Sequence, residues 1–485
     1  MPAQSDPTNF IAMKGACTMH STTAKPTDNV ILHDFAANDN QREIGAGVSP
    51  TEDGVAKVFA NVYRDQLRYC HTAGAWHEWT GQYWKRDEKE IALHYARLMA
   101  REMSKGTNSP RTLASIRKRS FARGVEGFAQ GEPILARTFE DWDRDPFLLG
   151  TPDGTVDLRT GKLREADPAD GITKITSVSP SDAEDCRRWL QFLAEAMNDD
   201  KEKIRFLKQW TGYCLSGDTR EQKLVFAYGP GGNGKGMYVN TVKHIMNDYA
   251  VVASMETFTA SKWDRHPTDL AMLRGARLVT ASETEQGRAW AESRIKSLTG
   301  GDPITARFMR ENFFTYMPQF KLTIIGNHQP SLHSVDEANR RRFMIVPFTH
   351  TPAKKDLELD KKLISEAPGI LRWAINGYLD WQREGLVRPK SIAEATEAYF
   401  AEQDVFGQWL SDCCRVDIRN RSVSEFAADL FESWAKYAEA AGEHAGTAKS
   451  FGQELVKRGF ERKRTQHGAM YIGVQVSRPA ASNDA

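Results

Sequence analysis

The segment that decides the fold reads KLVFAYGPGGNGKGMYVNTVKHIM and spans residues 223–246. The apolar run over 224–228 predicts a β-strand, and the spacing of apolar residues after 236 is compatible with a helix. The glycine-rich loop between them contains the pattern G-x-x-x-x-G-K, in which glycines let successive backbone N–H groups turn toward phosphate oxygens. The dipole of the following helix also favours an anion at this point. The segment therefore predicts a phosphate-binding loop, and the alternative is a glycine-rich surface turn.

The predicted nucleotide-binding residues are those of this loop and of the first helical turn. They are Gly229, Pro230, Gly231, Gly232, Asn233, Gly234, Lys235, Gly236 and Met237. Lys235 is expected to reach the β- and γ-phosphates of ATP. The motif usually continues with Ser or Thr as a Mg²⁺ ligand, whereas this chain has Gly236, and Thr241 lies more than one helical turn further along. We therefore expect Mg²⁺ to depend on phosphates, waters and acidic side chains.

Three further apolar runs, over 277–281, 321–326 and 343–348, predict strands. Helical stretches alternate with them, which indicates an α/β fold built on a parallel sheet. Glu283 and Glu285 follow the first of these runs, where a carboxylate can hold hydrated Mg²⁺ through a water and orient the attacking water. We favour Glu283 for that role; the alternative is a pair of surface glutamates that start a helix. Asn327 follows the second run and is the candidate sensor of the γ-phosphate.

An arginine cluster precedes the last predicted strand in DEANRRRFMIVPF, residues 336–348. An arginine at a subunit edge can stabilise charge on the γ-phosphate of a neighbour's nucleotide, which presupposes a ring. Arg342 or Arg341 is the candidate for this role. A solvated or acid-paired cluster is the alternative.

The composition excludes several classes of protein. The 485 residues are 40% hydrophobic and 27% charged, and no apolar run approaches the roughly 20 residues that a bilayer span requires. The first residues show no pattern of a secretory signal, so we expect a cytoplasmic protein without a membrane partner. Six scattered cysteines form neither a disulfide framework nor a zinc-binding spacing. The net charge of +1 means that affinity for nucleic acid must come from local patches.

Five motifs in order resemble those of superfamily 3 helicases. They are GPGGNGKG, LVTASETE, IKSLTGGDPITARF, KLTIIGNHQP and DEANRRRFMIVPF. The closer resemblance is to the helicase portion of phage and plasmid primase-helicases, which are related to the poxvirus primase-helicase. The upstream segments WHEWTGQYW and GTPDGTVDLRTGKL resemble the helicase-associated N-terminal domain of that family, so the resemblance covers about residues 55–475.

The resemblance implies a replicative helicase of a phage, prophage or plasmid, acting in the cytoplasm of a bacterial host. Its AAA+-like core would assemble as a homohexameric ring, use ATP and Mg²⁺ to translocate on single-stranded DNA from 3′ to 5′, and unwind forked DNA. No primase polymerase domain is expected before the helicase, so a separate primase is the expected partner. The alternative is an initiator or loader that binds origin DNA and uses ATP only to switch assembly.

The resemblance also implies a β-hairpin in the DNA channel near residues 305–314. This hairpin would expose Arg307, Phe308 and Arg310, and Lys296 lies in the preceding motif I-K-x-L-T-G-G-D. A cation beside an aromatic ring can combine attraction to phosphate with base stacking. Simple packing or rim charge is the alternative for these residues.

The C-terminal region predicts helices over 424–441 and 449–458, followed by a hairpin in FERKRTQHGAMYIGVQV. This is the order of a winged-helix domain, and its basic residues suit duplex DNA. The candidate contacts are Lys457, Arg458, Arg462, Lys463 and Arg464. A wing that docks protein is the alternative.

The sequence therefore divides into six predicted segments. They are a disordered tail (1–47), a helicase-associated α+β domain (48–200), the ATPase core (201–352), a helical connector (353–402), a winged-helix-like domain (403–476) and a second disordered tail (477–485). The basic run over 101–123 fits a solvated helix face or a DNA contact. Asp141, Asp143 and Asp145 alternate, and they fit either a turn or one face of a strand that binds metal.

Overall fold

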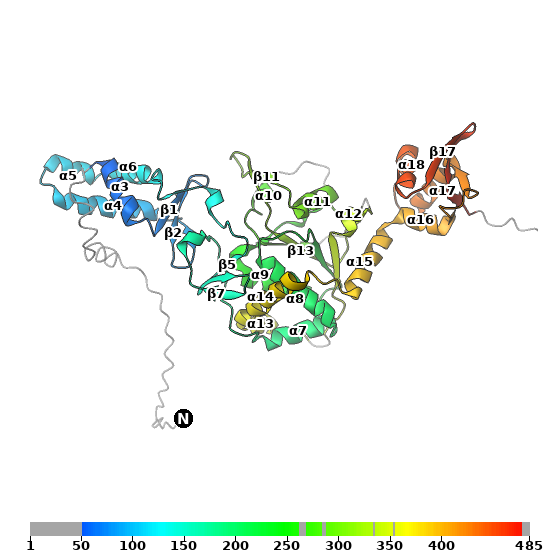
Figure 1. Cartoon of the computed structure of the whole chain (residues 1–485), viewed down its shortest axis with the longest axis horizontal. Helices are drawn as coiled ribbons and strands as arrows, with labels where there is room; N and C mark the ends of the chain where they lie inside the picture. Colours follow the sequence, from blue (N-terminus) through cyan, green and yellow to red (C-terminus); the bar gives the residue numbers. More distant parts are fainter. Residues whose placement is uncertain (1–50, 261–267, 284–287, 333–334, 353–354, 478–485) are drawn as a thin grey trace, which may run out of the picture. The chain divides into compact units, whose positions relative to one another are not determined.

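The computed structural model describes residues 51–260, 268–283, 288–332, 335–352 and 355–477 (Figure 1). The predicted tail over 1–47 and residues 478–485 of the second tail lie outside these ranges. The described residues form two compact units: one combines residues 51–69 with Glu88–Ala136, and the other combines Cys70–Asp87 with the described residues from 137 to 477. No helix within the described ranges has the length and apolar character needed to cross a bilayer.

The first unit is helical. Its helices are α3 (Glu52–Val62), α4 (Ile91–Met103), α5 (Pro110–Ile116) and α6 (Arg119–Gln130), with a 3₁₀ turn, η1 (Ser104–Gly106), after α4. The hydroxyl of Ser109 accepts from the backbone of Thr112 and caps α5, whose first residue is a proline. The chain turns at Arg117 and Lys118, which separate α5 from α6.

Small antiparallel elements open the second unit. The strands are β2 (Ala75–Trp79) and β3 (Trp84–Arg86), which pair antiparallel, and the meander β5 (Leu148–Thr151), β6 (Gly154–Asp157) and β7 (Lys162–Arg164). The two short strands β1 (Leu67–Cys70) and β4 (Ala136–Arg137) stand where the chain passes between the units.

The three alternating aspartates do not share a strand face. Asp141 ends a 3₁₀ turn, η2 (Phe139–Asp141), and accepts from the backbone of Thr138. Asp143 adopts a left-handed backbone with φ of 47° and binds Thr173. Asp145 forms an ion pair of 2.7 Å with Arg159. Each carboxylate thus stabilises a separate piece of loop, and the metal-binding reading is wrong.

A five-stranded parallel sheet forms the centre of the second unit, in the order β14-β8-β13-β10-β9. Its strands are β8 (Leu224–Tyr228), β9 (Ala250–Val252), β10 (Leu278–Glu283), β13 (Lys321–Gly326) and β14 (Phe343–Pro347). The four strands predicted from apolar runs are all present. The edge strand β9 was not predicted, because three residues give too short an apolar run to stand out.

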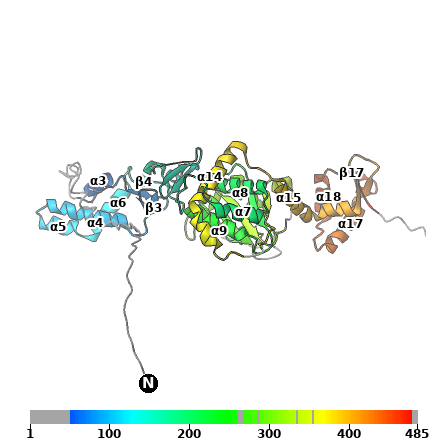
Figure 2. The ribbon, with the colours of Figure 1, turned by 90° about the horizontal axis from the view of Figure 1, so that it is seen from below.

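Helices cover both faces of this sheet. One face carries α7 (Arg187–Met197), α8 (Lys201–Leu215), α9 (Lys235–Met246), α13 (Leu359–Ser365) and α14 (Ala367–Glu384), as Figure 2 shows for four of them. The other face carries α10 (Thr268–Ala271), α11 (Glu292–Gly300), α15 (Lys390–Gln403) and the hairpin β11 (Ile304–Ala306) and β12 (Phe314–Tyr316). Along β8, Val225 faces the first group and Phe226 the second, so burial on both sides explains the continuous apolar runs.

Two helices under the sheet meet at backbone distance. A Cβ on Gly212 of α8 would lie 2.2 Å from the backbone nitrogen of Tyr378 in α14, and one on Gly377 would lie 2.1 Å from the carbonyl oxygen of Lys208. Any larger side chain at either glycine would force the helices apart. We call this place the α8–α14 glycine contact.

The C-terminal part packs around Trp409, Trp434 and Phe451. Its elements are α16 (Val405–Cys413), β15 (Cys414–Val416), β16 (Ser424–Phe426), α17 (Ala427–Ala440), α18 (Ala448–Lys457), β17 (Glu461–Thr465), β18 (Gly468–Ile472) and β19 (Val474–Val476). Two helices followed by an antiparallel hairpin are present in the predicted order. The first helix begins later than predicted, because residues 424–426 pair with β18 as a strand.

Candidate functional site

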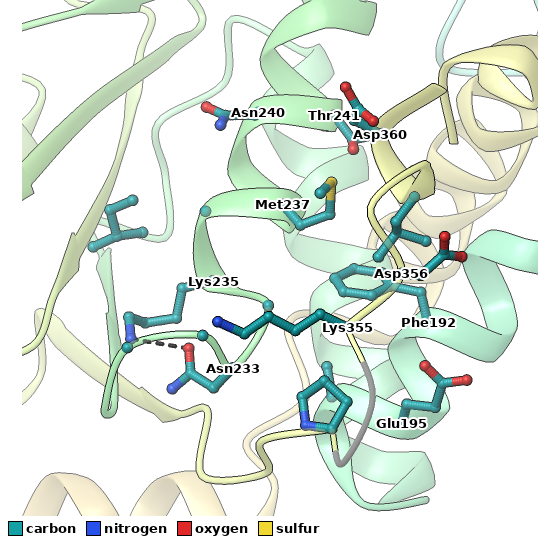
Figure 3. Close-up of a pocket in the computed structure, with 18 of the residues that line it drawn as sticks. Phe192, Glu195, Asn233, Lys235, Met237, Asn240, Thr241, Lys355, Asp356 and Asp360 are labelled. Carbon is teal, nitrogen blue, oxygen red and sulfur yellow. Dashed lines mark hydrogen bonds between the residues drawn. The ribbon is translucent and has the colours of Figure 1, made fainter. Parts of the chain in front are cut away.

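The phosphate-binding loop joins β8 to α9 and closes around one lysine. The ammonium of Lys235 donates to the carbonyl oxygens of Gly229 and Pro230, at 2.5 and 2.9 Å. It also donates to Oδ1 of Asn233 at 3.0 Å (Figure 3). Asn233 in turn donates from its amide to the carbonyl oxygen of Phe348, just after β14. Burial lowers the pKa of Lys235, and these oxygens hold the ammonium where β8 ends.

A larger side chain at either of two glycines of the loop would be strained by a left-handed backbone and crowded by a neighbouring element. Gly229 has a φ of 149°, and a Cβ there would lie 2.0 Å from the carbonyl oxygen of Phe348. Gly234 has a φ of 93°, and a Cβ there would lie 2.9 Å from the ring of Phe192. The glycine pattern that predicted the loop thus reflects its close packing against neighbouring elements.

The ends of three parallel strands meet beside this loop. Tyr228 at the end of β8 is in register with Gly326 of β13, which is in register with Glu283 of β10. Asn327 follows β13, is exposed and lines the same cavity as Lys235. Glu283 therefore ends its strand at the predicted edge, although the structure does not describe its side chain. Glu285 lies outside the described residues.

A cavity of about 900 Å³ lies over the loop and receives residues from elements far apart in the sequence. Residues 231–237 line it, as do Lys355 after β14 and both Arg188 and Phe192 of α7. Figure 3 shows Lys355 extending toward the loop. These residues carry no signal in the sequence, because only the packing of α7 and of the chain after β14 over the loop brings them there. The volume of the cavity and the cations that line it suit a nucleotide and the phosphates it carries.

The missing hydroxyl at Gly236 is not a consequence of crowding. A Cβ added there would meet nothing within 4 Å. The described residues include no cluster of three or more His, Cys, Asp or Glu side chains that could cage a metal. Asp356, Asp360 and Thr241 do line the cavity (Figure 3). Mg²⁺ commonly binds through one or two carboxylates together with phosphates and waters, and the residues present fit that arrangement.

The arginine cluster divides into three environments. Arg340 is paired with Glu397 at 2.5 Å, as the acid-paired alternative predicts. Arg342 is only 7% exposed, and its guanidinium donates to the carbonyl oxygen of Ala338 at 2.7 Å. Arg341 is exposed. Because a residue that reaches a neighbouring subunit must be accessible, Arg341 replaces Arg342 as the better candidate.

Comparisons with known proteins match the chain in two places. Residues 56–198 match the family described as D5 N terminal like, and residues 227–342 match a family of unknown function. A putative helicase of Acanthamoeba polyphaga mimivirus is 23% identical over 355 residues, covering 68% of this chain and 37% of that protein. A putative helicase of Frog virus 3 is 26% identical over 267 residues, covering 50% and 27%. The resemblance to phage and viral primase-helicases is confirmed.

The chain spans about a third of the length of these curated relatives. Among solved structures, the apo form of the NrS-1 C terminal region aligns with 88% of this chain and 99% of its own length, at 12% identity and a TM-score of 0.46. A second apo structure of that region aligns with 84% and 96%, at 11% identity and a TM-score of 0.45.

The hairpin implied by the primase-helicase resemblance is present. β11 and β12 pair antiparallel, and the loop over 307–313 joins them. Phe308 is 38% exposed, Arg310 is exposed with a left-handed φ of 66°, and the half-buried Arg307 lies 4.6 Å from the ring of Phe313. Lys296 differs from these loop residues in having an acidic partner: its ammonium forms an ion pair of 2.7 Å with Asp336.

The C-terminal basic residues also separate into two kinds. Arg458 donates to both carboxylate oxygens of Asp404, at 2.6 and 3.1 Å, and to Glu454 at 2.8 Å. Its predicted role in DNA contact is therefore corrected, because its donors are used inside the fold. Lys457 is exposed and lies 3.6 Å from Glu454. The other three predicted contacts, Arg462, Lys463 and Arg464, are exposed on β17.

Proposed function

We propose that this chain is the motor of an ATP-dependent DNA helicase that acts in the replication of a phage, prophage or plasmid, in a bacterial cytoplasm. The observation that carries the proposal is the phosphate loop with Lys235 at the sheet edge where β10 and β13 also end. This arrangement supports an AAA+-like P-loop core. The similarity to putative helicases of two viruses, at 23% and 26% identity, supports the same activity class.

The roles of the site residues follow from their positions. Lys235 and the loop N–H groups bind and orient the β- and γ-phosphates of ATP. Glu283 holds the attacking water, and a water bound to Mg²⁺, while Asn327 lies between the loop and β10 and contacts the γ-phosphate. Bound Mg²⁺ supplies charge neutralisation to the phosphates.

In this proposal the chain assembles as the homohexameric ring that the resemblance implies. Arg341 reaches the nucleotide of the neighbouring subunit, and the 307–313 loops of six subunits grip single-stranded DNA in the channel. Translocation runs from 3′ to 5′. The C-terminal two helices and hairpin act as a winged-helix domain whose strand β17 contacts duplex DNA, and a separate primase supplies primers.

The test is displacement of a fluorescent strand from forked DNA with ATP and Mg²⁺. Forks that carry only a 3′ or only a 5′ tail distinguish the polarity, and Lys235→Ala is the inactive control. Strand separation by the unmodified chain on 3′-tailed forks alone is the expected result. ATP hydrolysis stimulated by DNA without strand separation would instead support the origin-binding initiator or loader, for which the exposed cations of β17 provide a duplex contact.

A further inference from the structure

A second concave surface lies entirely within the first compact unit. It has a volume of about 790 Å³ and lies between α4 and the junction of α5 with α6. Lys89 lines it before α4, and six further basic residues lie on its two walls: Arg97, Arg101 and Lys105 on α4 and η1, and Arg117, Lys118 and Arg119 at the junction. All six are exposed. We call this surface the basic groove.

Acidic side chains do not balance these charges. Among the described residues that line the groove, Glu90 is the only acid, and its carboxylate lies 2.7 Å from Arg123. Lys105 pairs with Glu102 at 2.7 Å but keeps 72% of its side chain exposed. The groove therefore concentrates positive charge in a hollow, where the potential is stronger than on a convex surface.

The junction belongs to two helices with opposite preferences for charge. Arg117 is the C-cap of α5, where a helix dipole favours a cation, whereas Lys118 and Arg119 begin α6, where it does not. The first turn of α6 contains no acidic residue, and its cap, Lys118, makes no side-chain capping bond. The positive end of a helix dipole stabilises acids and repels cations. Lys118 and Arg119 therefore add positive charge at the positive end of the α6 dipole.

We propose that the basic groove binds the backbone of single-stranded DNA. Arg97, Arg101 and Lys105 recur every four residues, a rise of about 6 Å per step along a helix, which is of the same order as the distance between successive phosphates in a strand. The half-buried Leu93 also lines the groove and offers apolar contact to a base, whereas Ala100 and Ile116 are buried. The faces of bases are accessible to such a contact only in single strands. Single-stranded DNA is therefore favoured over duplex DNA as the ligand of the groove.

This site is separate from the phosphate loop and requires no nucleotide, so the proposal does not rest on the motor assignment. The experiment measures the fluorescence anisotropy of a labelled oligodeoxythymidylate of about 20 nucleotides, longer than the roughly 4–16 nucleotides of common single-strand sites. The full chain is used without ATP, over a series of salt concentrations. The triple variants are Arg117→Ala/Lys118→Ala/Arg119→Ala and Arg97→Ala/Arg101→Ala/Lys105→Ala.

A matched control removes three exposed lysines elsewhere, as Lys361→Ala/Lys390→Ala/Lys436→Ala, so that the net charge changes equally. Each groove variant is expected to bind about tenfold more weakly than the control, and its slope of log K against log salt is expected to be shallower by about 2, since each lost phosphate contact contributes about 0.7. The thermal unfolding midpoints of the groove variants should equal that of the control variant.

Three outcomes would overturn the proposal. One is a groove variant that binds as tightly as the control. Another is an equal loss for duplex DNA, and the third is a loss confined to an RNA oligonucleotide of matched sequence. ATPase and strand displacement are measured separately, so loss of the motor proposal and loss of the groove proposal give different results.

Discussion

The phosphate loop and the basic groove both present cations, but the fold treats them differently. Lys235 is 6% exposed, and three oxygens of its own loop hold it in place. The side chains of the basic groove are exposed on two helical walls. A short sequence motif can therefore predict a site whose geometry is determined by the backbone. A site assembled from exposed side chains becomes visible only when helices bring them together.

The largest expected effect tests the buried side of this comparison. Lys235→Ala removes the charge that faces the phosphates, so ATP turnover should be abolished. Phosphate release with saturating ATP and DNA measures it. Lys243→Ala, on the same helix but outside the cavity, is the matched control and should retain its turnover. Turnover of Lys235→Ala near that of the control would refute the nucleotide site.

The arginine cluster gives the next effect. Arg341→Ala should bind nucleotide normally but lose about 1000-fold in turnover, the lower end of what a finger arginine supplies. Arg342→Ala should instead lower the unfolding midpoint, because its guanidinium is buried against Ala338. ATPase assays and thermal unfolding of both variants distinguish the two roles.

A mixing experiment shows whether Arg341 acts across an interface. Subunits carrying Arg341→Ala mixed with subunits carrying Glu283→Gln should regain part of the activity, because some interfaces then contain both native groups. Absence of rescue at every mixing ratio would count against a shared site.

Arg458 offers a smaller effect on stability. Replacing it by alanine leaves the carboxylates of Asp404 and Glu454 without their partner, so the free energy of unfolding should fall by about 2–3 kcal/mol. Lys463→Ala should leave stability unchanged and weaken duplex DNA binding. Chemical denaturation and anisotropy of both variants measure this, and equal stability of the two would show that the ion pairs contribute little.

The smallest effect concerns the missing hydroxyl. Space is open at Gly236, so Gly236→Ser should fit and lower the Mg²⁺ concentration for half-maximal ATPase by about 2- to 10-fold, the value of one added polar contact. Gly236→Ala is the control for the side chain itself. Superimposable Mg²⁺ titrations of the two variants would show that this position lies outside the metal's reach.

Much of the core could be predicted from sequence, because buried parallel strands are continuous apolar runs. Such runs were sufficient to predict β8, β10, β13 and β14 but not the three-residue edge strand β9. The phosphate loop was predictable because its glycines are required by its backbone.

Side-chain roles that depend on distant partners could not be predicted. Arg341 and Arg342 are neighbours in the chain, and only the packing before β14 buries one and exposes the other. The partner of Arg458, Asp404, is 54 residues away. Lys355 follows β14, which pairs with β8 on the side opposite to β13, and it reaches the cavity from there. Composition and spacing carry no signal for such contacts.

The α8–α14 glycine contact has a mechanical consequence. Where two helices touch through their backbones, no flexible side chains lie between them to absorb sliding. The pair of helices therefore resists relative sliding of α8 and α14. Elastic deformation is easier in surface loops, which have no such backbone contact. A force generated at one edge of the sheet would then reach the other without being dissipated in the helices below it.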